Sequence, residues 1–232
     1  TYHAEADFYA LFESMPNLRN LYLASCGLTS FLNNGPSSAQ LQTSSLIGLN
    51  IDLSGNDLTE MPSLEGLGVK KLHLSDNNIE LKAGDFEGVP ARQLYLQRYK
   101  YANLMPIAGL NETLSELYMS DSDLSHIPPA EFYNLIARLP IIRNGNFINS
   151  NLTTFPDLRP LGRTDEPIVY LQRNPLVCDC RLAWIREDGF LLRDYTSVRC
   201  DSPGHLQGRL IKDLSIEEMC PGEGTGRFID LD

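Results

Sequence analysis

Four cysteines near the carboxy-terminal end of this 232-residue chain are the side chains best placed for covalent or metal chemistry. Cys178 and Cys180 are separated by one residue, and Cys200 and Cys220 follow as distant single residues. Such a set could hold zinc or form two disulfide bonds. Zinc usually takes paired Cys-x₂₋₄-Cys knuckles, so the spacing favours disulfides. Each would contribute roughly 3–4 kcal/mol on a chain-entropy treatment. Disulfides persist in oxidising compartments, so we expect a secreted or cell-surface protein.

The other reactive side chains give little sign of catalysis. The histidines lie far apart in the sequence, at His3, His73, His126 and His205. The sequence contains no Gly-x-Ser-x-Gly, no His-Glu-x-x-His and no phosphate-binding glycine loop. Asp121-Ser-Asp123 has acidic spacing suited to calcium but lacks the glycine and the late glutamate of a calcium loop. We therefore expect no enzymatic activity, no cofactor and no metal site.

The charge balance narrows the classes of partner. Lys and Arg number 19 against 30 Asp and Glu, a formal net charge of −11, and no basic run of five to eight residues occurs. This balance gives no attraction for nucleic acid. The apolar runs are shorter than the roughly 18 residues that cross a bilayer, so membrane attachment would need an anchor outside this chain. An apolar content of 42% suffices for one elongated domain with a sizeable core.

One short sequence pattern recurs along most of the chain. Its clearest copy, residues 69–81, has an apolar residue followed by x-x-Leu-x-Leu-x-x-Asn-x-Ile. Aligned on the asparagine, seven copies place the ladder residues at Cys26, Asn56, Asn77, Tyr99, Ser122, Ser150 and Asn174. This is a leucine-rich repeat. The predicted fold is a curved right-handed α/β solenoid, with a parallel sheet on its concave face and short helices or 3-10 turns on its convex face.

The pattern also predicts which side chains are buried. Stacked repeats share one core because no single repeat can bury its own apolar side. An asparagine at the strand exit can donate and accept hydrogen bonds at once, which satisfies buried backbone groups. The ladder position of Cys26 therefore predicts a buried thiol; the alternatives are an intermolecular disulfide or a partner in an absent amino-terminal cap. The Tyr99 side chain cannot make the backbone hydrogen bonds that an asparagine makes at this position, so we expect a local distortion around Tyr99 and Tyr101. Convex turns should cover Phe86 and Phe132.

The carboxy-terminal segments carry a family resemblance. Residues 174–185, Asn-Pro-Leu-Val-Cys-Asp-Cys-Arg-Leu-Ala-Trp-Ile, and residues 198–210 resemble the cysteine-flanked cap of animal extracellular leucine-rich repeat proteins, the family of Slit, Toll receptors and Nogo receptor. The resemblance implies that Cys178 pairs with Cys200 and Cys180 with Cys220. It also implies that Trp184 covers the open end of the core.

These features divide the chain into four parts. Residues 1–17 are a partial repeat or an amino-terminal helical cap, 18–175 the repeats, 176–220 the disulfide-bonded cap and 221–232 a flexible tail. Two sequons, at Asn111 and Asn151, are candidate glycosylation sites in an extracellular protein.

The repeat places outward-facing residues in columns. The column between the two strand leucines contains Tyr22, Asp52, His73, Tyr95, Tyr118, Asn146 and Tyr170. The column two residues past the second leucine adds the charged residues Asp76, Arg98, Asp121 and Arg173. Tyrosine and arginine are enriched at interface hot spots, so this stripe predicts partner binding. Alternatively, tyrosine is there only because it suits strands.

The expected function is a non-catalytic extracellular module that binds a protein ligand on its concave face, as part of a cell-surface receptor or an adhesion or guidance protein. One alternative is recognition of microbial or glycan ligands in innate immunity. Another is a structural extracellular-matrix protein, for which a homodimer formed through the concave face or an edge would be the sign.

Overall fold

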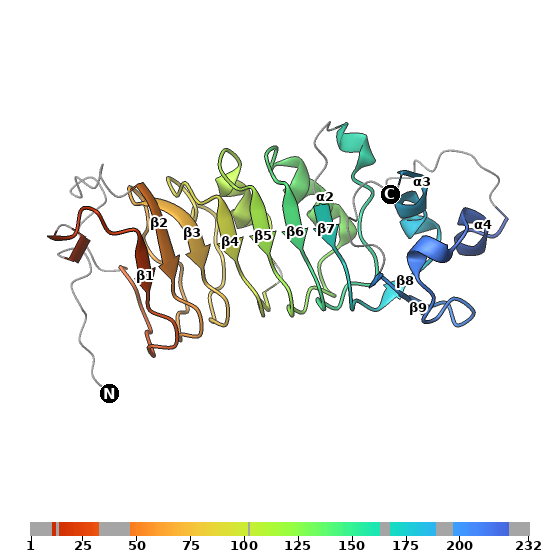
Figure 1. The fold of residues 1–232 in the computed structure, drawn as a ribbon, viewed down its shortest axis with the longest axis horizontal. Coiled ribbons are helices and arrows are strands. Elements are labelled where there is room, and N and C mark those ends of the chain that lie inside the picture. The colour runs from red at the N-terminus through yellow and green to blue at the C-terminus, as the bar shows by residue number, and fades with distance from the viewer. Residues whose placement is uncertain are drawn as a thin grey trace.

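Seven short parallel strands lie side by side in chain order and form one sheet along the molecule (Figure 1). The computed structural model describes residues 11–12, 14–32, 47–101, 103–162, 168–188 and 197–222. The strands are β1 (Asn20–Tyr22), β2 (Ile47–Asp52), β3 (Gly68–His73), β4 (Gln93–Tyr95), β5 (Glu116–Tyr118), β6 (Asn144–Asn146) and β7 (Ile168–Tyr170). This sheet confirms the predicted leucine-rich repeat solenoid. Most of segment 1–17 and nearly all of the tail lie outside the described residues.

The opposite face of the solenoid carries short helices and turns. They include η2 (Met105–Leu110), α2 (Pro129–Ala137) and η3 (Arg159–Leu161). α2 starts with a proline, whose fixed φ suits the first helical position. Residues 83–88 form successive turns rather than a regular helix. Phe86 and Phe132 are each 1% exposed beneath these segments, as the sequence predicts.

The inward strand positions build a continuous apolar core. Leu72, Leu94 and Leu117 are adjacent in register on β3, β4 and β5, and each is fully buried. Gly145 on β6 breaks this row, but the fully buried ring of Phe147 occupies the space. A Cβ atom on Gly145 would lie only 2.9 Å from Cε2 of Phe147. Phe147, two residues along the same copy, therefore fills the space that a leucine side chain at position 145 would occupy.

The ladder residues tie consecutive repeats together through the backbone. Asn56 Oδ1 accepts hydrogen bonds from the amides of Cys26 and Leu28, both at 3.0 Å. Its Nδ2 donates to the carbonyls of Leu23 and Leu53, both at 2.8 Å. One buried side chain thus satisfies donors and acceptors in two repeats.

The structure corrects one expectation about the ladder and limits another. Cys26 is exposed rather than buried. Its strand β1 is at the edge of the sheet, and among the described residues no strand pairs with its outer side, so stacking protects the thiol on one side only. β4 stays in register with both neighbours, so any distortion around Tyr99 and Tyr101 does not extend into the sheet. The Tyr99 ring is buried, and its hydroxyl donates to the Asn103 carbonyl at 3.3 Å.

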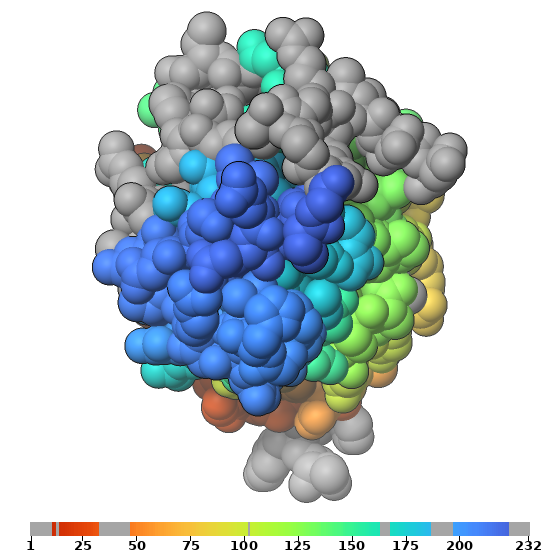
Figure 2. Space-filling view, turned by 90° about the vertical axis from the view of Figure 1, so that its right-hand side faces the viewer, coloured from red at the N-terminus to blue at the C-terminus, as the bar shows by residue number. Residues whose placement is uncertain are grey.

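The carboxy-terminal cap closes one end of the repeat stack (Figure 2). It comprises β8 (Leu176–Val177), η4 (Cys180–Leu182), α3 (Trp184–Asp188), β9 (Cys200–Ser202), η6 (Ile211–Asp213) and α4 (Ile216–Met219). β8 and β9 pair in parallel, and Trp184 is 6% exposed within the apolar core.

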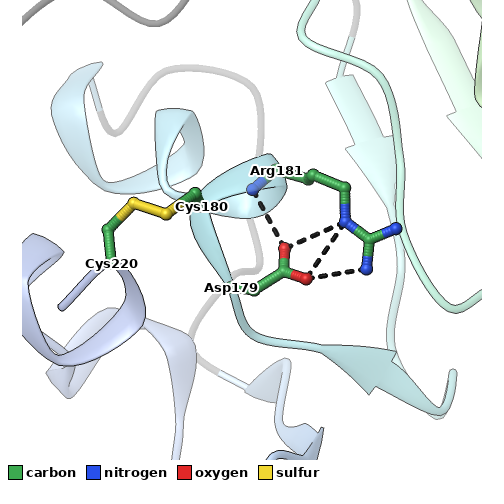
Figure 3. The surroundings of a disulfide bond; sticks show 4 residues. All are labelled: Asp179, Cys180, Arg181 and Cys220. Atoms are coloured by element: carbon green, nitrogen blue, oxygen red, sulfur yellow. Dashed lines mark hydrogen bonds and ion pairs between the residues drawn. A yellow bond between two sulfur atoms is a disulfide. The ribbon is translucent and has the colours of Figure 1, made fainter. Parts of the chain in front are cut away.

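The cap is cross-linked by two disulfide bonds. They join Cys178 to Cys200 and Cys180 to Cys220, the pairing that the family resemblance implies. Beside the second bond, the Arg181 guanidinium pairs with Asp179 at 2.7 Å, and the Arg181 amide donates to the same carboxylate (Figure 3). In the part of the chain that the structure describes, no helix is long and apolar enough to cross a membrane.

Candidate protein-binding surface

Sheet register brings the predicted aromatic residues into one row across the strands. We define the ring row as Tyr22, Asp52, His73, Tyr95, Tyr118, Asn146 and Tyr170, one residue from each strand from β1 to β7. Each pairs in register with the next. The column that the repeat spacing predicts is therefore a physical row on the sheet face.

The middle of the ring row is a stack of three rings, which we call the ring stack: His73, Tyr95 and Tyr118. The His73 and Tyr95 centroids are 3.8 Å apart with 7° between the planes. The Tyr95 and Tyr118 centroids are 4.4 Å apart with 4° between the planes. Because the planes are parallel and face each other, both faces of Tyr95 are covered, and its accessible part is the ring edge.

A hydrogen-bond network fixes the two tyrosines of the stack. The Tyr118 hydroxyl donates to Glu116, and Gln93 Nε2 donates to the same carboxylate at 2.8 Å. The Tyr95 hydroxyl donates to Gln93 Oε1 at 3.4 Å. Burial, with a further contribution from Glu116, raises the pKa of both tyrosines, so both hydroxyls stay protonated at neutral pH. The network limits how freely the rings can move.

His73 is held in its neutral form. Burial in the stack lowers its pKa, nearby Asp52 opposes this shift, and the positive charge of Lys71 adds to it. Because the ordinary pKa is about 6.5, the imidazole carries no charge at neutral pH. The stack therefore presents three uncharged rings.

The two outer tyrosines stand apart from the ring stack. Tyr22 is 70% exposed on β1, and Tyr170 is half-buried on β7. Among the described residues, neither ring contacts another aromatic ring. Asp52 separates Tyr22 from His73, and Asn146 separates Tyr118 from Tyr170. The structure thus brings together three of the five predicted rings.

The charged column lies where the strands end. Asp76, Arg98, Asp121 and Arg173 all have a left-handed backbone, with φ between 56° and 60°. Arg98 forms a two-fold ion pair with Asp76, and Asp121 accepts from Asn149 Nδ2 at 2.7 Å. Asp76 and Arg98 are therefore already paired with each other. Arg173 is exposed.

Sequence reasoning missed the polar column that supports the rings. Gln93 and Glu116 occupy the register position two residues before the tyrosines and bind their hydroxyls. The repeat spacing contained this signal, since that column faces the same side of the sheet.

Both sequon asparagines are exposed; Asn151 Nδ2 donates to Asp123 Oδ1 at 3.1 Å. Among the described residues, no group of three or more metal-ligating side chains is close enough to hold an ion.

The repeated strands, the asparagine ladder and the cross-linked end define this chain as a leucine-rich repeat protein with a cysteine-flanked carboxy-terminal cap. Its sequence is similar to Toll-like receptor 2 of Bos taurus, with 28% identity over 180 residues, which cover 73% of this chain and 21% of that receptor. It is also similar to trophoblast glycoprotein of Macaca fascicularis, with 25% identity over 230 residues, 90% of this chain and 49% of that protein.

The fold has a counterpart among solved structures. The crystal structure of human 5T4 (Wnt-activated inhibitory factor 1, trophoblast glycoprotein) superposes with a TM-score of 0.58 at 20% identity and covers 87% of each chain. At this identity the likeness shows the fold alone. No protein-family model matches the chain. The chain spans about a fifth of the length of the matched Toll-like receptor 2 and about half of trophoblast glycoprotein.

Proposed function

We propose that this chain is a non-catalytic extracellular module that binds a protein ligand through its concave sheet face, within a cell-surface receptor or an adhesion or guidance protein. The observation that carries the proposal is the ring stack at the centre of the sheet, half-buried and braced by Gln93 and Glu116. Tyrosines held in this way lose little entropy on binding.

The dimensions of the sheet suit such a role. Seven strands at a spacing of about 4.8 Å give a face about 29 Å long. With side-chain relief, this is on the order of the ~800 Å² that each partner buries in a standard protein interface. The ring stack lies on β3 to β5, the middle strands, where hot spots concentrate.

The test compares two sets of tyrosine substitutions. The tetramerised chain is applied to cells that each display one extracellular protein from an arrayed library, and the partners that it binds are measured by surface plasmon resonance. The double variant Y95A/Y118A should weaken binding at least 30-fold, which is about 2 kcal/mol. The control is Y133A, which removes a half-buried tyrosine from α2 on the convex face. Full affinity in Y95A/Y118A, with affinity lost in Y133A, would overturn the proposal.

Recognition of microbial or glycan ligands is a second candidate, supported by the similarity to Toll-like receptor 2. The ring stack offers little surface for glycan binding, because sugar rings pack on aromatic faces and both faces of Tyr95 are covered. Only the outer faces of His73 and Tyr118 remain. A glycan array probed with the chain tests this candidate, and bound glycans that Y118A releases would favour it over a protein ligand.

A further inference from the structure

The ring row is interrupted at two places by small polar side chains. Asp52 lies between Tyr22 and His73, and Asn146 lies between Tyr118 and Tyr170. Neighbouring strands are about 4.8 Å apart, so the two residues that flank each interruption are roughly 9–10 Å apart. A planar group in contact with two ring faces needs about 7–8 Å. Each interruption therefore has room for one planar group.

Hydrogen bonds hold both small side chains against their own strands. Asp52 Oδ1 accepts from the Ser54 amide at 3.0 Å and from the Ser54 hydroxyl at 2.6 Å. Asn146 Oδ1 accepts from the Ile148 amide at 3.1 Å. Asp52 Oδ2 has no hydrogen-bond partner among the described residues. The floor of the first gap thus offers a carboxylate oxygen that is free to accept.

The walls of the first gap suit a cation. One face of the His73 ring is covered by Tyr95, so the other face is turned toward Asp52. Tyr22, on the opposite side, is 70% exposed. A guanidinium over an aromatic face gains a cation–π attraction, and its fork matches a carboxylate. An acidic chain with a net charge of −11 also attracts basic partners.

We propose that the gap formed by Tyr22, Asp52 and His73, the Asp52 gap, binds an arginine side chain of a basic protein partner. The proposal rests on the proposed function, because it names the chemistry by which the sheet face would recognise a protein. The corresponding gap between Tyr118 and Tyr170 contains the uncharged side chain of Asn146 and does not select for charge. Lys71, in register with Asn50 beside the Asp52 gap, repels an incoming cation and limits the affinity for a single side chain.

The test titrates the isotope-labelled whole chain with N-acetyl-arginine amide and, separately, with the neutral isostere N-acetyl-citrulline amide, followed by NMR. The arginine compound should bind in the millimolar range and shift the ring resonances of Tyr22 and His73. The citrulline compound should bind at least five-fold more weakly. D52N should weaken arginine binding at least five-fold. The control D57N makes the same change of net charge at an exposed position in the exit turn of the same repeat and should have no effect.

A gain of function gives an independent measurement. N146D places a carboxylate between Tyr118 and Tyr170 and should create a second arginine site, seen as new shifts of those two rings. Equal binding of arginine and citrulline, or unchanged arginine binding in D52N, would overturn the proposal. That failure is distinguishable from failure of the proposed function, which is measured with whole protein partners and with Y95A/Y118A.

Discussion

Removing the ladder asparagine at position 174 should be among the most destabilising single truncations in the repeats. Asn174 Oδ1 accepts hydrogen bonds from the Ser150 amide at 2.8 Å and the Leu152 amide at 3.0 Å. Its Nδ2 donates to the Phe147 carbonyl at 2.7 Å and the Leu171 carbonyl at 2.9 Å. The side chain is 6% exposed. N174A would therefore leave four backbone groups without partners where water has little access.

The magnitude follows from these contacts. A net value of about 1 kcal/mol for each hydrogen bond gives about 4 kcal/mol for Asn174. Ser150 occupies the preceding ladder position, and its hydroxyl lies 2.9 Å from the Met119 carbonyl and 3.2 Å from that of Ile148. A hydroxyl has a single proton to donate, so S150A should cost only about 1 kcal/mol. The two truncations thus differ several-fold although the residues share one structural position.

Urea unfolding at equilibrium measures the difference. The chain has a single tryptophan, Trp184, in the cap, so its fluorescence reports on that end while far-UV circular dichroism reports on the whole. Coincident curves would show that the repeats and the cap unfold together. With a slope of about 2 kcal/mol per molar urea, N174A should lower the midpoint by about 2 M and S150A by about 0.5 M. A cost for N174A within about 1 kcal/mol of the cost for S150A would refute the ladder argument.

Three other perturbations test particular contacts. The His73 pKa, followed by NMR, should lie below about 6.5 and rise in Y95A, which re-exposes the imidazole; stability due to this shift is complete above pH 6.5 and declines as the pH falls toward the folded pKa. G145L should cost about 1–3 kcal/mol because Phe147 fills that space, and the added F147L substitution should restore stability in a double-mutant cycle. Expression in a glycosylating host should attach an N-glycan at Asn111, seen as a mass that N111Q loses.

The sequence was sufficient to predict the strands and their order because the repeat period is redundant. Each copy places its leucines and its ladder residue at the same spacing. A copy that departs from the pattern can therefore still be aligned from the copies on either side. Register followed as well: aligning Asn77 with Asn56 is enough to set His73 beside Asp52. The same redundancy identifies the column of tyrosines.

What the pattern could not supply depends on neighbours in space. Spacing treats every copy as having a repeat on both sides, and so it misjudged Cys26, which follows β1, the strand at the sheet edge. A glycine in place of a buried leucine at position 145 gives no sign in the linear pattern that the Phe147 ring turns into the vacated volume. Tyr99 likewise fits without disturbing the sheet, since its ring has room to be buried.

Ring orientation is the feature that bears most on the proposed function, and no spacing rule contains it. Parallel strands about 4.8 Å apart carry successive side chains nearly at aromatic stacking distance, so adjacent rings on one row pack face to face. His73, Tyr95 and Tyr118 do so, and as a result they cover each other's faces. An uninterrupted aromatic row therefore offers a ligand its ring edges, and a face becomes available only where a small residue interrupts the row. Asp52 and Asn146 are those interruptions, so the proposed arginine site at Asp52 lies at one of the two places in the row where a ring face can be reached.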